Sequence, residues 1–216
     1  MEIVLSNIGK RYGLNWIFRN VNYTLHSGQS YTLTGHNGSG KSTLLKILSG
    51  GLTPSEGGVQ FIINGKESTP YNVAQEMAFT APYISLIEDF TLQEMLEFHF
   101  KFKKMRTQSI DDLMDIIGLK EHEDKFISKF SSGMMQRLKL SLTILSDPEV
   151  LLLDEPTAYL DENAIQWYRE LLLNHMKDRL LIIGSNQKHE YSFIDSHIIH
   201  VPDFKYVRKK FYGTKL

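Results

Sequence analysis

The chain contains no cysteine, carries a net charge of only -1 over 216 residues, and has no long apolar run. Without cysteine it can form no disulfide, no cysteine zinc site and no thiol nucleophile, which is typical of a reducing compartment. Its near-neutral charge provides no overall field that would favour nucleic acid or an anionic membrane. The most apolar stretches, residues 150–153 and 180–183, are far shorter than the roughly 20 residues of a membrane-spanning helix. Any work at a membrane is therefore expected to go through a partner.

The overall composition is that of an ordinary globular protein. A hydrophobic share of 42% and a charged share of 23% allow a substantial buried core. The length is compatible with one α/β domain over residues 1–216. The first residues show no basic segment followed by an apolar run, so we expect no secretory signal and a cytoplasmic location.

Short apolar runs alternate with longer helical patterns along the chain, as in a mainly parallel sheet covered by helices. Three earlier runs, at residues 3–5, 16–25 and 59–63, alternate in the manner of an antiparallel flap, with breaks at glycines 13, 28 and 65. Between residues 91 and 146 the apolar residues fall at helical spacing, which predicts a helical insertion. The strands expected in the parallel sheet are residues 31–34, 77–80, 150–153, 180–183 and 197–201.

Residues 35–42 match the phosphate-binding loop pattern, in which a strand precedes the loop and a helix follows it. The glycines let the backbone curl so that several amide protons point at one anion, and the helix adds its positive end. Lys41 is expected to reach the outer phosphates, and the Ser42 hydroxyl to bind magnesium. The alternative is a glycine-rich turn that matches by accident, which the strand and helix on either side disfavour. The candidate nucleotide-binding residues here are Gly35, His36, Asn37, Gly38, Ser39, Gly40, Lys41, Ser42 and Thr43.

Two carboxylates, Asp154 and Glu155, follow the apolar run at residues 150–153. Ligands collect where parallel strands end, because side chains emerge there beside a bound phosphate. Asp154 suits magnesium coordination, and Glu155 suits a general base or a group that orients water. The alternative is a pair of solvated carboxylates in a loop.

Residues 130–137, with the sequence Phe-Ser-Ser-Gly-Met-Met-Gln-Arg, open a helical pattern shortly before that strand. Ser131, Ser132 and Gly133 would form a helix N-terminus able to donate hydrogen bonds to an anion, although alone they are only a helix cap. The segment resembles the signature of ABC ATPases, typically Leu-Ser-Gly-Gly-Gln, and it stands at the family's place in the chain. The resemblance implies an α/β P-loop NTPase core with a mainly parallel sheet, an N-terminal antiparallel β flap and a helical subdomain at approximately residues 83–146.

The resemblance also implies a function. ABC ATPases bind ATP and Mg2+ and dimerise, so that each ATP lies between one chain's phosphate loop and the other chain's signature segment. A homodimer, or a heterodimer with a similar subunit, would then drive a separate integral membrane permease from the inner face of the cell membrane. Tyr12 resembles the residue that stacks on adenine, unless it only packs within the flap. Asp161 resembles the aspartate that bridges the two subunits, unless it only caps a helix.

The chain departs from the family at two positions. Pro82 stands where a glutamine is expected in the Q-loop, and neither Gln75 nor Gln93 is in register to replace it. Asn186 stands where the family usually has histidine; its amide can still donate to a phosphate, but it cannot titrate. His189 lies three residues further on and is expected to be solvated. Catalysis through Glu155, Lys41 and Asn186 is therefore expected, at a reduced rate.

Two other functions remain open. One is a soluble ABC ATPase for cofactor assembly; the coiled coils of repair members and the second ATPase unit of translation members are absent. The other is a weakly hydrolysing ATP-gated switch, which Pro82 and Asn186 favour. Basic residues alternate with aromatic ones at residues 98–106 and again in the tail at residues 205–215. These runs are typical of solvated helix faces, and no nucleic-acid partner is expected.

Overall fold

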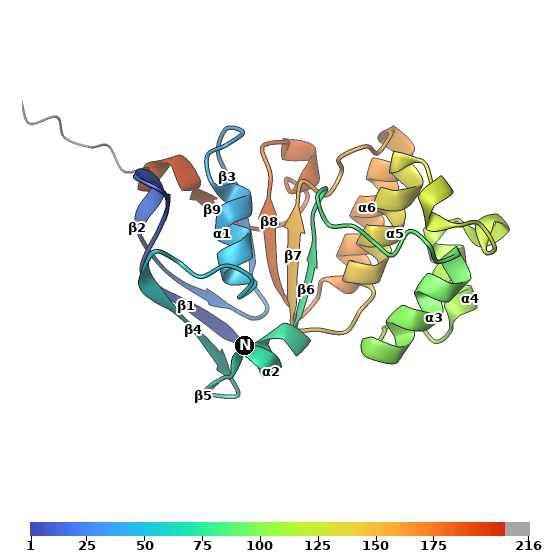
Figure 1. The fold of residues 1–216 in the computed structure, drawn as a ribbon, viewed down its shortest axis with the longest axis horizontal. Helices are drawn as coiled ribbons and strands as arrows, with labels where there is room; N and C mark the ends of the chain where they lie inside the picture. The colour runs from blue at the N-terminus through green and yellow to red at the C-terminus, as the bar shows by residue number, and fades with distance from the viewer. Residues whose placement is uncertain (206–216) are drawn as a thin grey trace, which may run out of the picture.

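The structure, a computed structural model, describes residues 1–205, so residues 206–215 of the basic tail lie outside the described residues. Figure 1 shows its layers: an antiparallel sheet, helix α1 (Lys41–Leu48), a parallel sheet, and further helices on the far side. No helix in the described range is long and apolar enough to cross a membrane.

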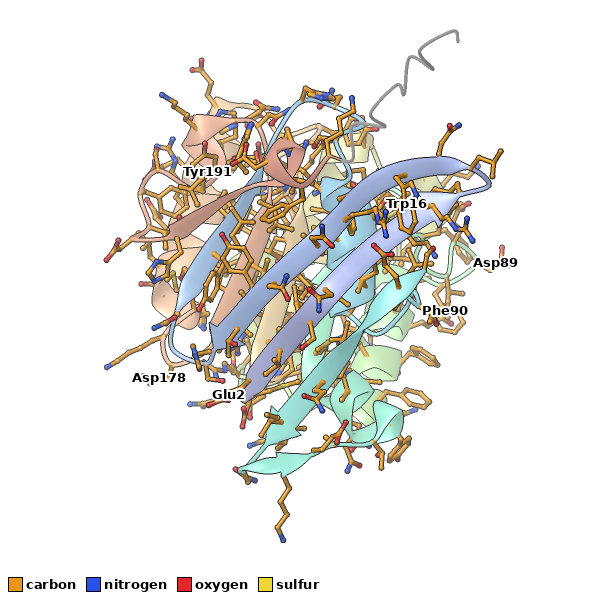
Figure 2. The ribbon with its side chains drawn as sticks, turned by 90° about the vertical axis from the view of Figure 1, so that its left-hand side faces the viewer. Glu2, Trp16, Asp89, Phe90, Asp178 and Tyr191 are labelled. Carbon is orange, nitrogen blue, oxygen red and sulfur yellow. The ribbon has the colours of Figure 1, made fainter. Side chains whose placement is uncertain are left out.

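The antiparallel sheet is the expected flap, and its strands follow the order β2-β1-β4-β5. Strands β1 and β2 form a hairpin whose turn includes Gly13 at φ +58°, as the sequence predicted. Strand β1 is longer than predicted because a bulge at Asn7, with φ 52°, interrupts its apolar alternation. Figure 2 looks onto the outer side of this sheet, with Glu2 and Trp16 towards opposite ends of it. The strands are β1 (Glu2–Tyr12), β2 (Asn15–His26), β4 (Glu56–Ile63) and β5 (Lys66–Glu67).

The parallel sheet follows the order β6-β7-β8-β3-β9, and every adjacent pair is parallel. In β7, Val150 and Leu152 join the core cluster that contains α1, whereas Leu151 and Leu153 join the cluster on the other face. Burial on both faces explains why the strands are continuous apolar runs in the sequence. All five carboxyl ends lie at one edge, which is where the candidate site is found. The strands are β3 (Ser30–Thr34), β6 (Met77–Thr80), β7 (Val150–Asp154), β8 (Leu180–Gly184) and β9 (His197–His200).

The helical insertion also forms as predicted. All of residues 91–146 are described by the structure, and no named strand lies among them. Helix α3 buries Leu92, Met95 and Leu96 on one side, which is the predicted helical spacing. Helix α2 was not predicted, because six residues are too few to show a periodicity. The helices besides α1 are α2 (Pro70–Gln75), α3 (Leu92–Phe102), α4 (Ile110–Ile117), α5 (Ser132–Ile144) and α6 (Glu162–His175), with 3-10 turns η1 (Lys120–His122), η2 (Ile127–Lys129), η3 (Lys188–Glu190) and η4 (Val201–Phe204).

Candidate functional site

The phosphate-binding loop connects β3 to α1 and is built around glycines that no other residue can replace without strain. Gly40 has φ +108°, and a Cβ there would lie 2.6 Å from the Ile17 side chain and 3.0 Å from that of Phe18. No side chain caps the start of α1, so its first amide groups have no side-chain acceptor. Free amides at a helix N-terminus form an anion site. The loop therefore has the backbone needed to hold phosphate.

The side chain of Lys41 is buried at the start of α1, with only 4% of the residue exposed. Its Nζ donates a hydrogen bond to the Gly35 carbonyl oxygen at 2.8 Å, which folds the side chain back along the loop. A buried ammonium with two further protons to donate is suited to bind a phosphate oxygen.

Asp154 ends β7 beside this loop and is almost fully buried. Burial is the main cause that raises the pKa of its carboxyl, and the neighbouring Glu155 charge adds to it. The nearby hydroxyls of Ser42 and Tyr83, together with the Lys41 charge, lower that pKa in part. The Oδ1 atom is buried and accepts no hydrogen bond, whereas Oδ2 accepts one from Tyr83 at 3.3 Å. An unpartnered carboxylate oxygen beside a hydroxyl fits a small divalent cation that prefers oxygen ligands.

Glu155 adopts the left-handed backbone conformation, with φ 45°. Its amide donates to the Gly184 carbonyl oxygen at 2.9 Å, which fixes the turn that follows β7. A non-glycine residue in this region costs about 1–3 kcal/mol, and such positions gather at functional sites. The half-buried Glu155 lines a cavity of about 420 Å³ together with His36, Asn37 and residues 185–187. Its carboxylate is therefore next to the phosphate loop.

Asn186 is bound to the phosphate loop by both ends of its amide. Its Oδ1 accepts from the Gly35 amide at 3.1 Å, and its Nδ2 donates to Asn37 Oδ1 at 3.2 Å. One of its amide protons remains for a phosphate. The expectation that His189 is solvated was wrong: it is half-buried, and its Nε2 lies 2.9 Å from Thr157 Oγ1.

The loop after β6 carries the other departure from the family pattern. Pro82 lies in this loop, and its carbonyl oxygen accepts a hydrogen bond from Lys139 Nζ at 3.2 Å. Neither neighbouring glutamine replaces the missing amide, because Gln75 donates to the Tyr71 hydroxyl and Gln93 to Glu97. The next residue, Tyr83, contacts Asp154 through its hydroxyl, and no pattern in the sequence predicted this contact.

The signature segment forms the predicted helix N-terminus. Ser131 is the N-cap of α5, and its Oγ accepts from the Met134 amide at 3.2 Å. Asp161 caps α6 in the same way, accepting from the Ala164 amide at 2.8 Å. Both segments line one cavity of about 440 Å³, and no residue of the phosphate loop lines it. The cavity is lined by Ser131, Ser132, Gly133, Met134, Arg137, Tyr159, Leu160, Asp161, Asn163 and Ala164.

Tyr12 ends β1 at the tip of the flap, where 55% of it is exposed. Lys10 Nζ lies 5.4 Å from its ring centroid. Because the ring is not buried within the flap, it is available to stack on a planar ligand.

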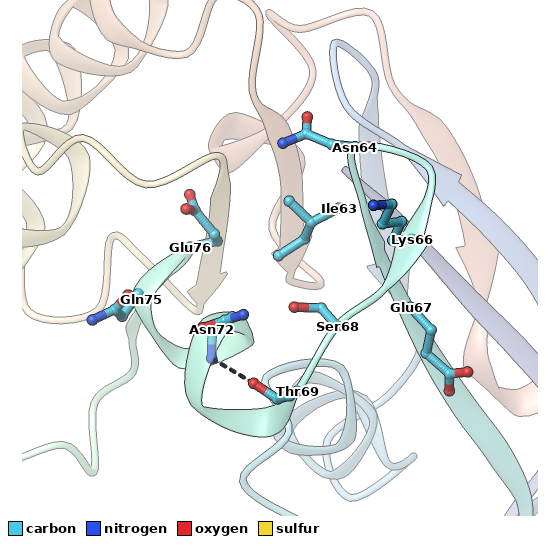
Figure 3. A pocket seen from close by; sticks show the side chains of 9 residues that line it. All are labelled: Ile63, Asn64, Lys66, Glu67, Ser68, Thr69, Asn72, Gln75 and Glu76. Carbon is cyan, nitrogen blue, oxygen red and sulfur yellow. Dashed lines mark hydrogen bonds between the residues drawn. The ribbon is translucent and has the colours of Figure 1, made fainter.

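A further cavity, of about 640 Å³, lies away from these residues, between the β4–β5 turn and α2 (Figure 3). Asn64 and Lys66 line one side of it, and Asn72, Gln75 and Glu76 line the other. Glu76 immediately precedes β6, so this cavity is at the amino ends of the parallel strands. None of the catalytic candidates reaches it.

Comparison with known proteins gives consistent matches. A family model described as "ABC transporter" matches residues 18–158. An uncharacterized ABC transporter ATP-binding protein, YybJ of Bacillus subtilis strain 168, is 32% identical over 191 residues, which is 87% of each chain. The lantibiotic transport ATP-binding protein SrtF of Streptococcus pyogenes is 32% identical over 206 residues, 93% of this chain and 83% of its own.

Solved structures share the fold. A putative ABC transporter ATP-binding protein from Pyrococcus furiosus has a TM-score of 0.78 at 22% identity, covering 95% of this chain and 100% of its own. A dimeric ATP-binding cassette in a post-hydrolysis state with ADP and Pi has a TM-score of 0.77 at 22% identity, covering 93% of this chain and 95% of its own. The predicted α/β class, with a parallel sheet and an antiparallel flap, is confirmed.

Proposed function

The chain belongs to the ABC transporter family of ATP-binding proteins, and on that premise we propose that it is the ATP-hydrolysing subunit of a transporter. The observation that carries this proposal is the meeting of Lys41, Asp154, Glu155 and Asn186, from three separate segments, at the carboxyl edge of the parallel sheet. The proposal takes residues 1–216 as one ATPase domain, with a helical part at approximately residues 83–146. Packing of helices from both halves of the chain on one sheet supports it.

ATP is held by the phosphate loop in this proposal. The free amides at the start of α1 and the buried Lys41 ammonium neutralise the outer phosphates. Tyr12 stacks on the adenine. Asn186, already bonded to Gly35, donates its remaining amide proton to the outer phosphate.

Magnesium fits the oxygen atoms present. Asp154 and Ser42 would hold the ion, because Oδ1 of Asp154 is buried without a partner and Ser42 lies at the same carboxylate. No group of three or more acidic, histidine or cysteine side chains that could hold a metal occurs among the described residues. Phosphate oxygens and water would therefore complete the coordination. When bound, the ion would neutralise the charge that develops on the phosphates.

Glu155 activates the attacking water. Its carboxylate borders the cavity beside the phosphate loop, within the part of the site that water can enter. A carboxylate there can accept the proton of the water as the water oxygen bonds to the outer phosphorus and the bond from that phosphorus to the departing ADP oxygen breaks. The turn that fixes Glu155 keeps it separate from Asp154, so that one carboxylate binds the cation and the other acts on water.

Two copies of the chain are needed to complete each site. Ser131, Ser132 and Gly133 line a cavity that contains no phosphate-loop residue. Within one chain the signature segment therefore does not contribute to the nucleotide site already described. In a dimer it would donate amide hydrogen bonds to the ATP of the opposite subunit, and ATP would favour the closed dimer by binding it better.

The membrane permease would dock on the helical part. Phe98 and Phe102 of α3 are exposed, and their ring centroids are 4.7 Å apart. Such exposed aromatic residues are enriched at protein interfaces. The subunit would then lie on the cytoplasmic face of the membrane through this partner.

Glu155→Gln tests the hydrolytic function. Loss of the base should lower magnesium-dependent phosphate release by about 10²- to 10⁴-fold, while ATP binding persists. Size-exclusion chromatography should then show an ATP-dependent dimer. Glu67→Gln, an exposed residue of β5, is the matched control and should leave turnover unchanged.

The second candidate function is a weakly hydrolysing ATP-gated switch. Asn186 favours it, because most of its amide is already hydrogen-bonded to the phosphate loop. If wild type shows no magnesium-dependent turnover, alone or with its permease, an ATP-gated switch replaces the hydrolase. Co-purification with a multi-span membrane protein separates a transporter from a soluble assembly ATPase.

A further inference from the structure

A tyrosine contacts the carboxylate at the end of β7, although it comes from a loop 71 positions earlier in the chain. The Tyr83 hydroxyl donates to Asp154 Oδ2 at 3.3 Å. Oδ1 of the same carboxylate is buried and has no hydrogen-bond partner. The hydrogen bond therefore distinguishes the two oxygens of Asp154, and it leaves Oδ1 as the buried oxygen without a protein donor.

The ring of Tyr83 is fixed on two further sides. Lys46 Nζ, from the last turn of α1, lies 4.0 Å from the ring centroid. Phe79, in β6, meets the ring edge-on at 6.4 Å between centroids. The ring therefore has contacts to hold its orientation even though 48% of the residue is exposed.

The residue before Tyr83 connects the same loop to the signature helix. Lys139 of α5 is 8% exposed, and its Nζ donates to the Pro82 carbonyl oxygen at 3.2 Å. The same helix begins at Ser132, directly after its Ser131 cap. A continuous series of contacts thus runs from Asp154 through Tyr83 and Pro82 to the helix that carries the signature segment.

We propose that Tyr83 is a positioning residue for the divalent cation, and that Lys139 couples it to the signature helix. The Tyr83 hydroxyl holds Oδ2 of Asp154 so that Oδ1 faces the cation. The Lys139–Pro82 hydrogen bond holds the loop, so movement of α5 changes the orientation of the Asp154 carboxylate. This inference rests on the proposed function only in taking Asp154 as a cation ligand.

Cation affinity measures this role directly. Mn2+, a paramagnetic substitute for Mg2+, is titrated with the full chain and a non-hydrolysable ATP analogue, and free Mn2+ is followed by electron paramagnetic resonance. Tyr83→Phe keeps the ring and removes the donor, so Mn2+ affinity should fall about 10-fold, as for other groups that orient a metal ligand. In hydrolysis assays the half-saturating Mg2+ concentration should rise, with little change in kcat at saturation.

A double-variant cycle tests the coupling. Lys139→Met removes the donor to Pro82 and should weaken Mn2+ binding in the same direction by a smaller factor. Combined with Tyr83→Phe it should add nothing further, because both act through one path. Tyr71→Phe is the matched control: it removes an exposed tyrosine hydroxyl that accepts from Gln75 on α2, and it should leave Mn2+ affinity unchanged.

Three results would overturn the inference: wild-type Mn2+ affinity in Tyr83→Phe, fully independent effects in the double variant, or no Mn2+ binding by the wild type. If the wild type hydrolyses no ATP but Tyr83→Phe still weakens Mn2+ binding, the hydrolase proposal fails and this inference stands. If Tyr83→Phe is unstable, Lys139→Met provides the same test without altering the ring.

Discussion

The phosphate loop and the two loops beside it leave the same edge of the parallel sheet, but they are held in different ways. The phosphate loop depends on its backbone, since Gly40 leaves no room for a Cβ beside Ile17. The loops after β6 and β8 act through side chains, Tyr83 on Asp154 and Asn186 on the phosphate loop. A backbone conformation such as that of Gly40 requires glycine, whereas a side-chain contact can be made by more than one residue type. A difference of this kind is expected in a chain that matches the phosphate-loop pattern but has Pro82 and Asn186 where the family resemblance predicts other residues.

Of these three loops, the phosphate loop is where the largest effect is expected. Lys41→Met removes a buried cation from the phosphate loop, so turnover should fall about 10²- to 10³-fold, as when a charge-stabilising donor is removed. Phosphate release and binding of a fluorescent ATP analogue provide the measurement. Lys66→Met, in exposed β5, should behave as wild type. Near-normal turnover in Lys41→Met would mean that the loop does not hold the outer phosphates.

Gly40→Ala tests the claim that backbone geometry holds the loop. The new Cβ would clash with Ile17 and Phe18 at a φ of +108°, which costs about 1–3 kcal/mol for the backbone alone. Thermal unfolding should occur at a lower temperature, and ATP affinity should fall because the first amides of α1 shift. The control is Gly58→Ala, where nothing lies within 4 Å of the added Cβ and φ is not in the left-handed region. An unchanged melting temperature in Gly40→Ala would contradict the distinction between the loops.

Local patterns made much of this site predictable. The phosphate loop is one unbroken segment of the sequence, and so is the strand that ends at Asp154. Each segment therefore places its functional residue, Lys41 or Asp154, at the carboxyl edge of a parallel sheet. The five parallel strands were predicted to within one residue at each end. Burial on both faces of the sheet produces continuous apolar runs in the sequence. The ends of each run therefore indicate the first and last residues of the strand.

Long-range and irregular features were not predictable in this way. The contact between Tyr83 and Asp154 joins residues 71 positions apart, and no local pattern marks a tyrosine as its donor. His189 appeared solvated because the sequence gives no sign that Thr157 lies beside it. Helix α2 and the bulge at Asn7 lack a usable period, since one is short and the other interrupts the alternation. The contacts of Tyr83 and His189 depend on how distant segments pack.

The smallest effect is expected at Asn186, because its contact comes from a replaceable side chain. Asn186→Ala removes two hydrogen bonds to the phosphate loop, one part-buried and one exposed, and at the lower limit of about 0.5 kcal/mol for each bond ATP affinity should fall roughly 5-fold. Asn186→His should recover part of this loss. It should also introduce a pH dependence of turnover near pH 6.5 that the wild type lacks at this position, because imidazole titrates there and an amide does not. The measurement is turnover between pH 6 and pH 8 in all three proteins. A larger loss in Asn186→Ala than in Lys41→Met would reverse the comparison, since the flanking loop would then bind ATP more strongly than the phosphate loop does.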